Sequence, residues 1–297
     1  MTPAAPLEGL IVKATGGFYY VQAGGLWECR ARGLFRKQGV RPLVGDRGLV
    51  EPTGEGEGYL VGLLPRKNAL TRPAVANLDR LVLVASVADP APNLFVLDKL
   101  MAIACHQGIP PALAVTKGDL ADPEPLAAVY RRVGIPVFTL TPQGGGLEEL
   151  RQALGRGISA FTGNSGVGKS TLLNRLDGRL GLQTGQTSRK LGRGRHTTRH
   201  VELFAMPPAG YIADTPGFSA VELERYEVIR REELADCFPE FSRFVGDCRF
   251  TGCSHTGEKG CAVAAAVERG EIPLSRWESY RALYEEAKKW KDWELKK

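Results

Sequence analysis

Residues 163–171 read GNSGVGKST and match the pattern G-x-x-x-x-G-K-[ST] without a gap. The apolar run ISAFT before them is typical of a buried strand, and KSTLLNRL after them has helical spacing. A strand, a glycine-rich turn and a helix in this order surround phosphate with backbone N–H groups and the positive end of a helix dipole. We therefore expect a P-loop α/β domain with phosphate contacts from Gly163, Asn164, Ser165, Gly166, Val167, Gly168, Lys169, Ser170 and Thr171.

Two side chains of this loop carry the expected chemistry. Lys169 is placed to reach the β- and γ-phosphates of a nucleotide as a catalytic charge, and Ser170 to ligate Mg²⁺. The alternative is a glycine-rich turn with a chance Lys-Ser pair. The flanking strand and helix argue against that alternative.

Upstream of the loop, short apolar runs alternate with segments of helical spacing. The runs, typical of buried strands, are 78–87, 111–117, 136–140 and 157–163, and the helical segments are 94–108, 125–134 and 146–154. This alternation predicts a doubly wound α/β domain. Met101 and Cys105 fall on an apolar helix face, where core packing explains them.

The apolar run at 111–117 leads into Thr116-Lys117-Gly118-Asp119. The carboxylate of Asp119 can accept hydrogen bonds from both the N1–H and the 2-amino group of guanine, whereas adenine offers no such pair of donors. The stem of Lys117 would lie along the base. Four residues match often by chance, but no comparable K-x-D follows a strand downstream of Gly217. We predict a guanine site.

Downstream, GYIADTPG at 210–217 places Asp214 at the end of an apolar run. We expect Asp214 to hold Mg²⁺ through water, and the N–H of Gly217 to reach the γ-phosphate. The following residue is Phe218, where a water-orienting glutamine is common. We therefore expect slow intrinsic hydrolysis.

The segment 181–200 lies between the P-loop helix and the next apolar run, VELFAMP. It has few apolar residues, and five basic residues without an acid between Arg189 and Arg199. We expect a switch loop in which Thr198, or its neighbour Thr197, ligates Mg²⁺. His196 is our first candidate for positioning the attacking water, against the alternative of a solvated basic loop.

The motif order is unusual because the guanine-reading residues precede the P-loop. A circular permutation explains this without changing the site, since only the connections move. The last strand of the domain then runs from the γ-phosphate sensor directly into the C-terminal segment. We expect nucleotide state to set the orientation of that segment.

Four potential metal ligands lie between residues 248 and 261. Cys248, Cys253, His255 and Cys261 form a Cys₃His set, which is a standard tetrahedral zinc site with no open position. We predict one structural zinc ion that folds a segment with little apolar core. The alternative is three free cysteines and a surface histidine. The other three cysteines are scattered, which favours the zinc site.

Residues 8–65 contain about five short β segments punctuated by glycine turns, namely 9–16, 17–24, 26–35, 46–52 and 58–65. They predict a small barrel of the OB type, with an SH3-like barrel as the alternative. Residues 1–72 hold +4 of the net charge of +6, which makes this part a candidate for contact with a polyanion such as RNA. The alternative, which net charge alone favours, is a soluble basic surface. The barrel also contains the aromatic residues Phe18, Tyr19, Tyr20 and Trp27; some of them must fill its core, and any that are exposed would offer stacking surfaces.

Composition excludes several classes of protein. The chain of 297 residues is 43% hydrophobic and 24% charged, as in soluble globular proteins. No apolar stretch approaches the ~20 residues of a membrane-spanning helix, and the first residues do not resemble a secretory signal. We expect a cytoplasmic monomer without a membrane partner, whose six cysteines form no disulfides.

The combination resembles the circularly permuted GTPases called ribosome small-subunit-dependent GTPase A, the small ribosomal subunit biogenesis family. The resemblance covers nearly the whole chain and is carried by GNSGVGKST at 163–171, RHTT at 195–198, DTPGF at 214–218 and C-x4-C-x-H-x5-C at 248–261. It implies late maturation of the small ribosomal subunit, binding to its rRNA, and GTP hydrolysis stimulated by the subunit. By motif match it also implies the phosphate-binding residues, the zinc ligands and the role of His196.

Three positions depart from the family pattern. Thr116 stands where Asn is usual, Arg199 where Thr is usual, and Leu140-Thr141 where Ser-Ala is usual in the second guanine-contacting loop. Asp119 is retained, so we expect the preference for guanine to survive.

We predict an OB-fold RNA-binding domain at 1–70, a circularly permuted P-loop GTPase domain at 71–220 and a mainly α zinc-binding domain at 221–297. The predicted function is a GTPase that acts as a timer on the small ribosomal subunit and passes between GTP- and GDP-bound states. One alternative is a nucleotide-gated RNA-binding scaffold with incidental hydrolysis, which Phe218 keeps open. A P-loop kinase of small metabolites is a third, and DTPG argues against it.

Overall fold

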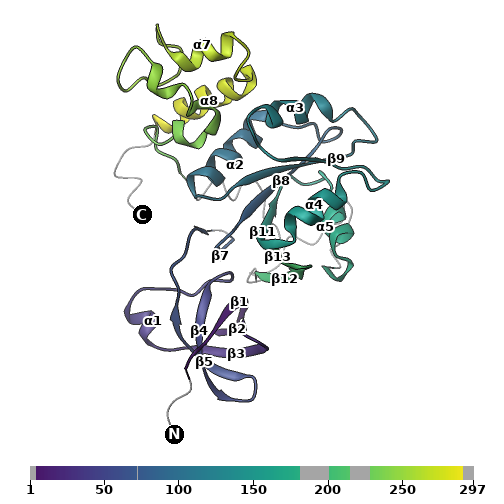
Figure 1. Ribbon diagram of the computed structural model, residues 1–297, viewed down its shortest axis with the longest axis vertical. Helices are drawn as coiled ribbons and strands as arrows, with labels where there is room; N and C mark the ends of the chain where they lie inside the picture. The colour runs from purple at the N-terminus through teal and green to yellow at the C-terminus, as the bar shows by residue number, and fades with distance from the viewer. Residues whose placement is uncertain (1–4, 72, 181–200, 215–227, 290–297) are drawn as a thin grey trace. The chain divides into compact units, whose positions relative to one another are not determined.

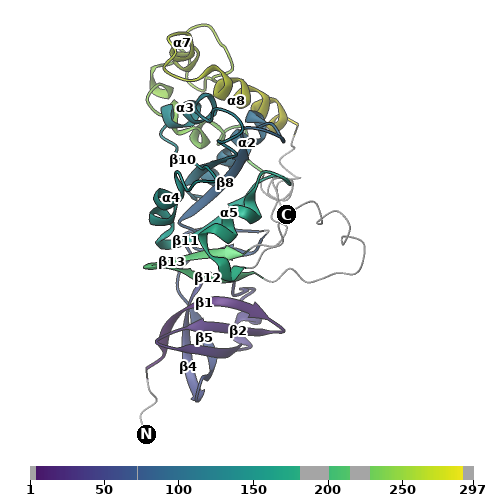
Figure 2. The same cartoon turned by 90° about the vertical axis from the view of Figure 1, so that its right-hand side faces the viewer.

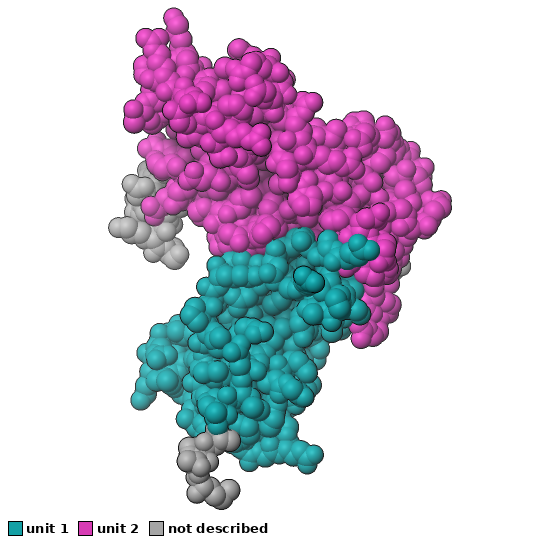
Figure 3. Space-filling view, viewed as in Figure 1, with its two compact units in different colours: residues 1–80, 152–161, 187–218 teal, residues 81–151, 162–186, 219–297 magenta. Residues whose placement is uncertain are grey.

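In the computed structural model of the chain, residues 5–71, 73–180, 201–214 and 228–289 are described. The chain divides into two compact units, which Figure 3 shows in different colours. The first unit takes residues 1–80, 152–161 and 187–218, and the second takes 81–151, 162–186 and 219–297. Neither unit is one continuous stretch of chain.

The N-terminal part of the first unit is a closed five-stranded barrel (Figure 2). Its strands are β1 (Leu7–Thr15), β2 (Phe18–Gln22), β3 (Leu26–Ala31), β4 (Arg47–Gly54) and β5 (Glu57–Leu63). The order β1-β2-β3-β5-β4 closes because β4 also pairs with β1, and only β3 and β5 run parallel. Buried Ile11, Val21, Val50 and Leu60 alternate with more exposed residues and fill the interior. The OB-type barrel is confirmed.

One predicted strand, 26–35, is too long. β3 ends at Ala31, and α1 (Leu34–Lys37) follows. The side chain of Phe35 is 6% exposed and joins the barrel core. Gly33 separates strand from helix, and the apolar Phe35 serves the core equally well from a helical turn.

Further along the chain, the first unit contains three more strands and a small hairpin. β11 (Arg156–Thr162) pairs in parallel with β13 (Ala209–Asp214), which pairs antiparallel with β12 (Glu202–Met206). β1 meets β12 at Lys13 and Glu202, whose side chains form a 3.0 Å ion pair. The small hairpin is β6 (Ala69–Leu70) with β7 (Val75–Ala76).

The antiparallel direction of β12 was not foreseen in the sequence, where strands alternating with helices predicted parallel pairing. Only Pro207 and Pro208 connect β12 to β13. A parallel connection needs a dozen or more residues, so a link of two residues forces a hairpin.

The second unit holds three parallel strands and most of the helices. The strands run in the order β10 (Val137–Thr139), β9 (Pro111–Thr116), β8 (Arg80–Ser86). The helices are α2 (Leu94–His106), α3 (Glu124–Arg132), α4 (Leu147–Leu154) and α5 (Lys169–Leu176), and the 3₁₀ turn η1 (Gly178–Leu180) follows α5. All six residues of β9 are buried, as an apolar run predicts for a parallel strand covered on both faces. The predicted α/β alternation is confirmed.

The C-terminal part of the second unit is mainly helical. It contains the turns η3 (Ala235–Cys237), η4 (Pro239–Phe241) and η5 (Val245–Asp247), and the helices α7 (Ala262–Glu268) and α8 (Leu274–Ala287). Its core contains the buried aromatic residues Phe238, Phe241 and Tyr280. Ala102 of α2 belongs to the same cluster of buried residues. α8 lies beside α2 (Figure 1). The helix predicted at roughly 275–295 is present but shorter, since α8 ends at Ala287; residues 290–295 of the prediction lie outside the described range.

A buried ion cluster joins α8 to α2. The guanidinium of Arg276 donates to Asp98 on α2 at 2.8 Å, and to Glu240 at 2.7 and 3.1 Å. The side chains of Arg276 and Asp98 are each 1% exposed. Burial raises the pKa of Asp98, and the charge of Arg276 opposes that rise. This contact fixes the C-terminal segment on the helix that follows β8.

Within the described residues, no helix combines the length and apolar character required to cross a bilayer.

Candidate nucleotide site and metal centre

The predicted P-loop connects β11 to α5. Gly166 and Gly168 have φ angles of 85° and 91°, the left-handed region where a side chain is strained. A Cβ on Gly163 would lie 2.6 Å from the carbonyl oxygen of Val84, so only glycine fits there. α5 begins at Lys169, and the N–H groups of its first turn therefore face the loop. The backbone has the form of a phosphate cradle.

The predicted base-reading turn touches the P-loop directly. The hydroxyl of Thr116, at the end of β9, donates to the carbonyl oxygen of Val167 at 2.6 Å. Lys117 has a φ of 60°, and its ammonium group donates to the carbonyl oxygen of Asp89. Asp119 is exposed. The structure thus brings residues 116–119 and 163–170 together, although almost fifty residues separate them in sequence.

The loop predicted to make the second guanine contact follows β10. Leu140 is 4% exposed, so its side chain belongs to the core. The N–H of Gly118 donates to the carbonyl oxygen of Leu140 at 3.4 Å, which places the loop beside the base-reading turn. Arg175 on α5 also contacts this loop, at Thr141 and Pro142. Sequence reasoning missed Arg175, because a helical arginine outside every motif gives no signal.

Several residues that the sequence singled out around the γ-phosphate lie outside the described residues. These are His196, Thr197, Thr198, Gly217 and Phe218. Asp214 is the last residue of β13, and its backbone pairs with that of Glu202 on β12. The assignments of the water-positioning residue and of the magnesium ligands therefore stay predictions.

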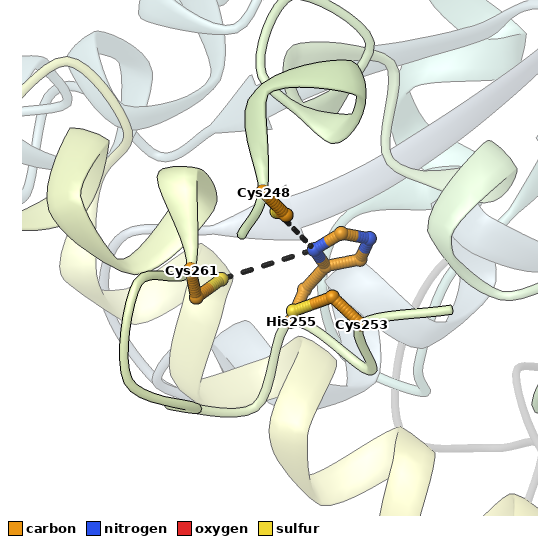
Figure 4. A group of neighbouring side chains, drawn as sticks. All are labelled: Cys248, Cys253, His255 and Cys261. Atoms are coloured by element: carbon orange, nitrogen blue, oxygen red, sulfur yellow. Dashed lines mark hydrogen bonds between the residues drawn. The ribbon is translucent and has the colours of Figure 1, made fainter. Parts of the chain in front are cut away.

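The four predicted metal ligands converge. Their donor atoms all lie within 4.8 Å of one another. Nδ1 of His255 is 3.5 Å from Sγ of Cys248 and 3.8 Å from Sγ of Cys261, as Figure 4 shows. Zinc–sulfur bonds of about 2.3 Å in a tetrahedron require separations of this size. The donor set fits one metal ion, with Nδ1 of His255 as the nitrogen ligand.

Hydrogen bonds fix the shape of the candidate metal-binding loop, residues 248–261. The carboxylate of Glu258 accepts from the N–H groups of Ser254 and Thr256 at 2.7 and 3.0 Å. Burial raises the pKa of Glu258, but a hydrogen bond from the Ser254 hydroxyl, together with these backbone bonds, outweighs burial and lowers the pKa to about 2. Trp277 Nε1 donates to the carbonyl oxygen of His255 at 2.8 Å. The loop therefore keeps its shape through a carboxylate that is ionised at neutral pH.

Burial acts on the protonation of the candidate metal ligands. The N–H of Ala262 lies 3.4 Å from Sγ of Cys248, and the N–H of Ala264 lies 3.4 Å from Sγ of Cys261. Burial raises the pKa of Cys253 and of Cys261, so a bound metal ion would have to displace the thiol protons. Burial lowers the pKa of His255, which favours the neutral imidazole, the form in which histidine binds a metal ion.

Two family models match the chain. The model described as RsgA GTPase covers residues 63–224, and that described as the RsgA N-terminal domain covers 8–60. The chain belongs to the RsgA GTPase family. It is therefore a GTP-hydrolysing enzyme with a permuted P-loop domain. The alternative hypothesis of a P-loop kinase of small metabolites is wrong.

Curated relatives from the RsgA family match over almost their full length. The small ribosomal subunit biogenesis GTPase RsgA of Caldanaerobacter subterraneus subsp. tengcongensis is 45% identical over 287 residues, 95% of this chain and 96% of the relative. The protein of the same name from Geobacillus kaustophilus is 44% identical over 289 residues, 95% of this chain and 97% of the relative.

Solved structures of similar chains agree. The circularly permuted GTPase YloQ superposes with a TM-score of 0.81 at 34% identity, and the match covers 97% of this chain and 96% of YloQ. YjeQ from Thermotoga maritima superposes with a TM-score of 0.80 at 32% identity, covering 96% of this chain and all of that one. The circular permutation predicted from motif order is thereby confirmed for this RsgA family member.

Proposed function

We propose that this GTPase binds the small ribosomal subunit, assists its late maturation and hydrolyses GTP to GDP and phosphate when the subunit stimulates it. The hydrogen bond from Thr116 to Val167 carries the nucleotide half of the proposal, because it joins the base-reading strand to the phosphate cradle. The names of the RsgA relatives support the ribosomal half.

The proposed site divides into phosphate, base and metal contacts. Residues 163–171 bind the phosphates, with Lys169 as the catalytic charge, and Asp119 reads guanine beside Thr116 and Lys117. Ser170, Thr198 and Asp214 hold the Mg²⁺ that accompanies GTP, which neutralises charge on the phosphates. His196 positions water and Gly217 senses the γ-phosphate.

The proposed identity of the metal in the C-terminal segment is zinc. Three sulfurs and one imidazole nitrogen form the soft tetrahedral set that zinc favours, and four protein ligands leave no position for a substrate. We assign a structural role and keep the domain boundaries 1–70, 71–220 and 221–297.

We further propose that the barrel contacts rRNA. The guanidinium of Arg30 lies 4.9 Å from the centre of the Phe18 ring, and that of Arg32 lies 5.8 Å from the centre of the Tyr59 ring. Such cation–aromatic pairs suit a phosphate backbone with stacked bases. A partner of this kind also fits a cytoplasmic monomer. Subunit binding without salt dependence would contradict the electrostatic part.

The decisive measurement is steady-state phosphate release from GTP, with and without purified small ribosomal subunits, and with ATP as the control. Strong stimulation restricted to GTP is the expected result. A slow rate that the subunit leaves unchanged would contradict the ribosomal part while leaving a GTPase.

The scaffold alternative, which the family membership does not favour, has its own test. Lys169→Ala removes the catalytic charge but leaves the barrel and the C-terminal segment intact. We expect this variant to fail in subunit maturation. A scaffold would still support it.

A further inference from the structure

Arg175 lies in the last turn of α5, the helix that Lys169 begins. Its guanidinium contacts the loop after β10 through two nitrogens. Nη1 donates to the carbonyl oxygen of Thr141 at 2.9 Å, and Nη2 donates to that of Pro142 at 3.2 Å. The planar fork of arginine can reach two successive carbonyls, whereas the single ammonium of lysine offers no such pair of fixed donors.

The loop that Arg175 contacts, residues 141–146, is closed by hydrogen bonds between its own residues. Thr141 accepts the N–H of Gly145 on its hydroxyl at 3.1 Å and donates its own N–H to the carbonyl oxygen of Gly145 at 3.2 Å. Gly146 has a φ of 71°, and a Cβ there would lie 2.2 Å from the carbonyl oxygen of Thr139. A loop closed in this way shifts as one piece, so a contact at its start places all of it.

The same loop borders the turn that carries Asp119. The carbonyl oxygen of Leu140 accepts the N–H of Gly118, and the N–H of Leu140 donates to the carbonyl oxygen of Val115 at 2.7 Å. Gly118 stands directly between Lys117 and Asp119. The chain of contacts therefore runs from Arg175, through the loop, to the residue that reads the base.

A second arginine steadies Arg175. Nη2 of Arg151, on α4, donates to the carbonyl oxygen of Arg175 at 3.0 Å. The end of α5 is thereby bound to α4 as well as to the loop. The position of Arg175 is fixed on both sides.

We propose that Arg175 is a positioning residue for base specificity, because it holds the loop 141–146 against the turn 117–119 from the helix that binds the phosphates. Arg175 thereby sets the distance between the phosphate-binding and base-binding parts of the site. The nucleotide that this distance suits has a purine with a 6-oxo and a 2-amino group. The proposal rests on the proposed guanine site. Arg175 acts in this proposal through its contacts with Thr141 and Pro142.

The test compares Arg175→Lys with Arg179→Lys in the full chain. Arg179 is an exposed arginine beyond the same helix, paired with Asp177, so its substitution controls for an arginine-to-lysine change nearby. Affinities for GDP and for IDP, which lacks the 2-amino group, are measured by titration calorimetry. The thermal midpoint of the nucleotide-free protein is measured in parallel.

Arg175→Lys should weaken GDP binding about tenfold, the equivalent of one charged hydrogen bond, and weaken IDP binding less. The dissociation constant for IDP divided by that for GDP should therefore be smaller in Arg175→Lys than in the wild type. The thermal midpoint of the nucleotide-free variant should be unchanged. Arg179→Lys should match the wild type. Wild-type affinity in Arg175→Lys, or equal losses for GDP and IDP with a lower midpoint, would overturn the proposal. A wild-type protein that does not prefer GDP would instead refute the guanine site itself.

Discussion

At the scale of single residues, Thr116 shows how one hydroxyl can serve where an amide is usual. Its Oγ1 donates to Val167 and also lies 3.2 Å from the carbonyl oxygen of Ala85. The side chain is 7% exposed, so the contact is shielded from water. A short side chain at this position therefore still joins β9 to the P-loop, and the exposed Asp119 remains the residue that we propose reads the base.

Removing this hydroxyl should weaken nucleotide binding. Thr116→Val keeps the shape of the side chain but leaves the carbonyl oxygen of Val167 without its donor, and we expect GDP affinity to fall roughly tenfold. Thr116→Asn should keep the contact and most of the affinity. Calorimetric titration with GDP measures both, with Thr139→Val on the neighbouring strand as control. Full affinity in Thr116→Val would show that the bond to Val167 does not matter.

The sequence was informative about residues that belong to a motif and silent about the others. The P-loop glycines and the Cys₃His ligands were predicted because their chemistry demands fixed spacing. Arg175 could not be predicted, since its partners are backbone carbonyls that any residue supplies. Arg276 also gave no signal, because an arginine in a polar helix is normally exposed.

At the scale of elements, the candidate metal-binding loop, residues 248–261, has a fixed shape without regular secondary structure. Between η5 and α7 the chain has no regular element, and residues 249–252 include the exposed Phe250. The four ligands and the contacts of Glu258 give this stretch its shape. Apolar periodicity predicts helices and strands well but cannot predict such a loop, for which we propose that metal coordination supplies the stability.

Loss of the metal should unfold this region selectively. We expect Cys253→Ser, or strong chelation, to remove one metal ion per chain and to destabilise α7 and α8 by several kcal/mol, roughly the scale of structural zinc sites. Elemental analysis and hydrogen exchange measure the two effects. Cys237→Ser, a buried cysteine outside the ligand set, should retain the metal. Protected α7 amides in the metal-free protein would contradict a structural role.

At the scale of the whole molecule, the buried ion cluster ties α2 to α8, so we expect the two helices to move together. The guanidinium of Arg276 also lies 4.6 Å from the centre of the Phe238 ring, so its contacts are both ionic and aromatic. Nucleotide-dependent movement of the C-terminal segment, expected from its direct link to Gly217, would have to carry α2 along or break this cluster. Matching X-ray scattering profiles in the GDP and GTP-analogue states would contradict such movement.

Breaking the cluster should be costly. Arg276→Met leaves two buried carboxylates without their cation, and we expect the opening of α8 to become about 3–5 kcal/mol easier. Hydrogen exchange of the α8 amides measures this opening. Arg269→Met, which removes an exposed pair with Glu271, should change it by less than about 1 kcal/mol. Equal effects of the two substitutions would show that burial of the cluster contributes nothing.

The ribosome synthesises the two partners of this ion pair at widely separated times. Asp98 and Arg276 are 178 residues apart in the chain, so at about 5–20 residues per second a ribosome needs roughly 10–35 s to supply the second after the first. Throughout that interval the nascent chain carries an uncovered apolar helix face with an unpaired acid. Each newly synthesised molecule therefore passes through a long period in which its own fold does not yet cover that face.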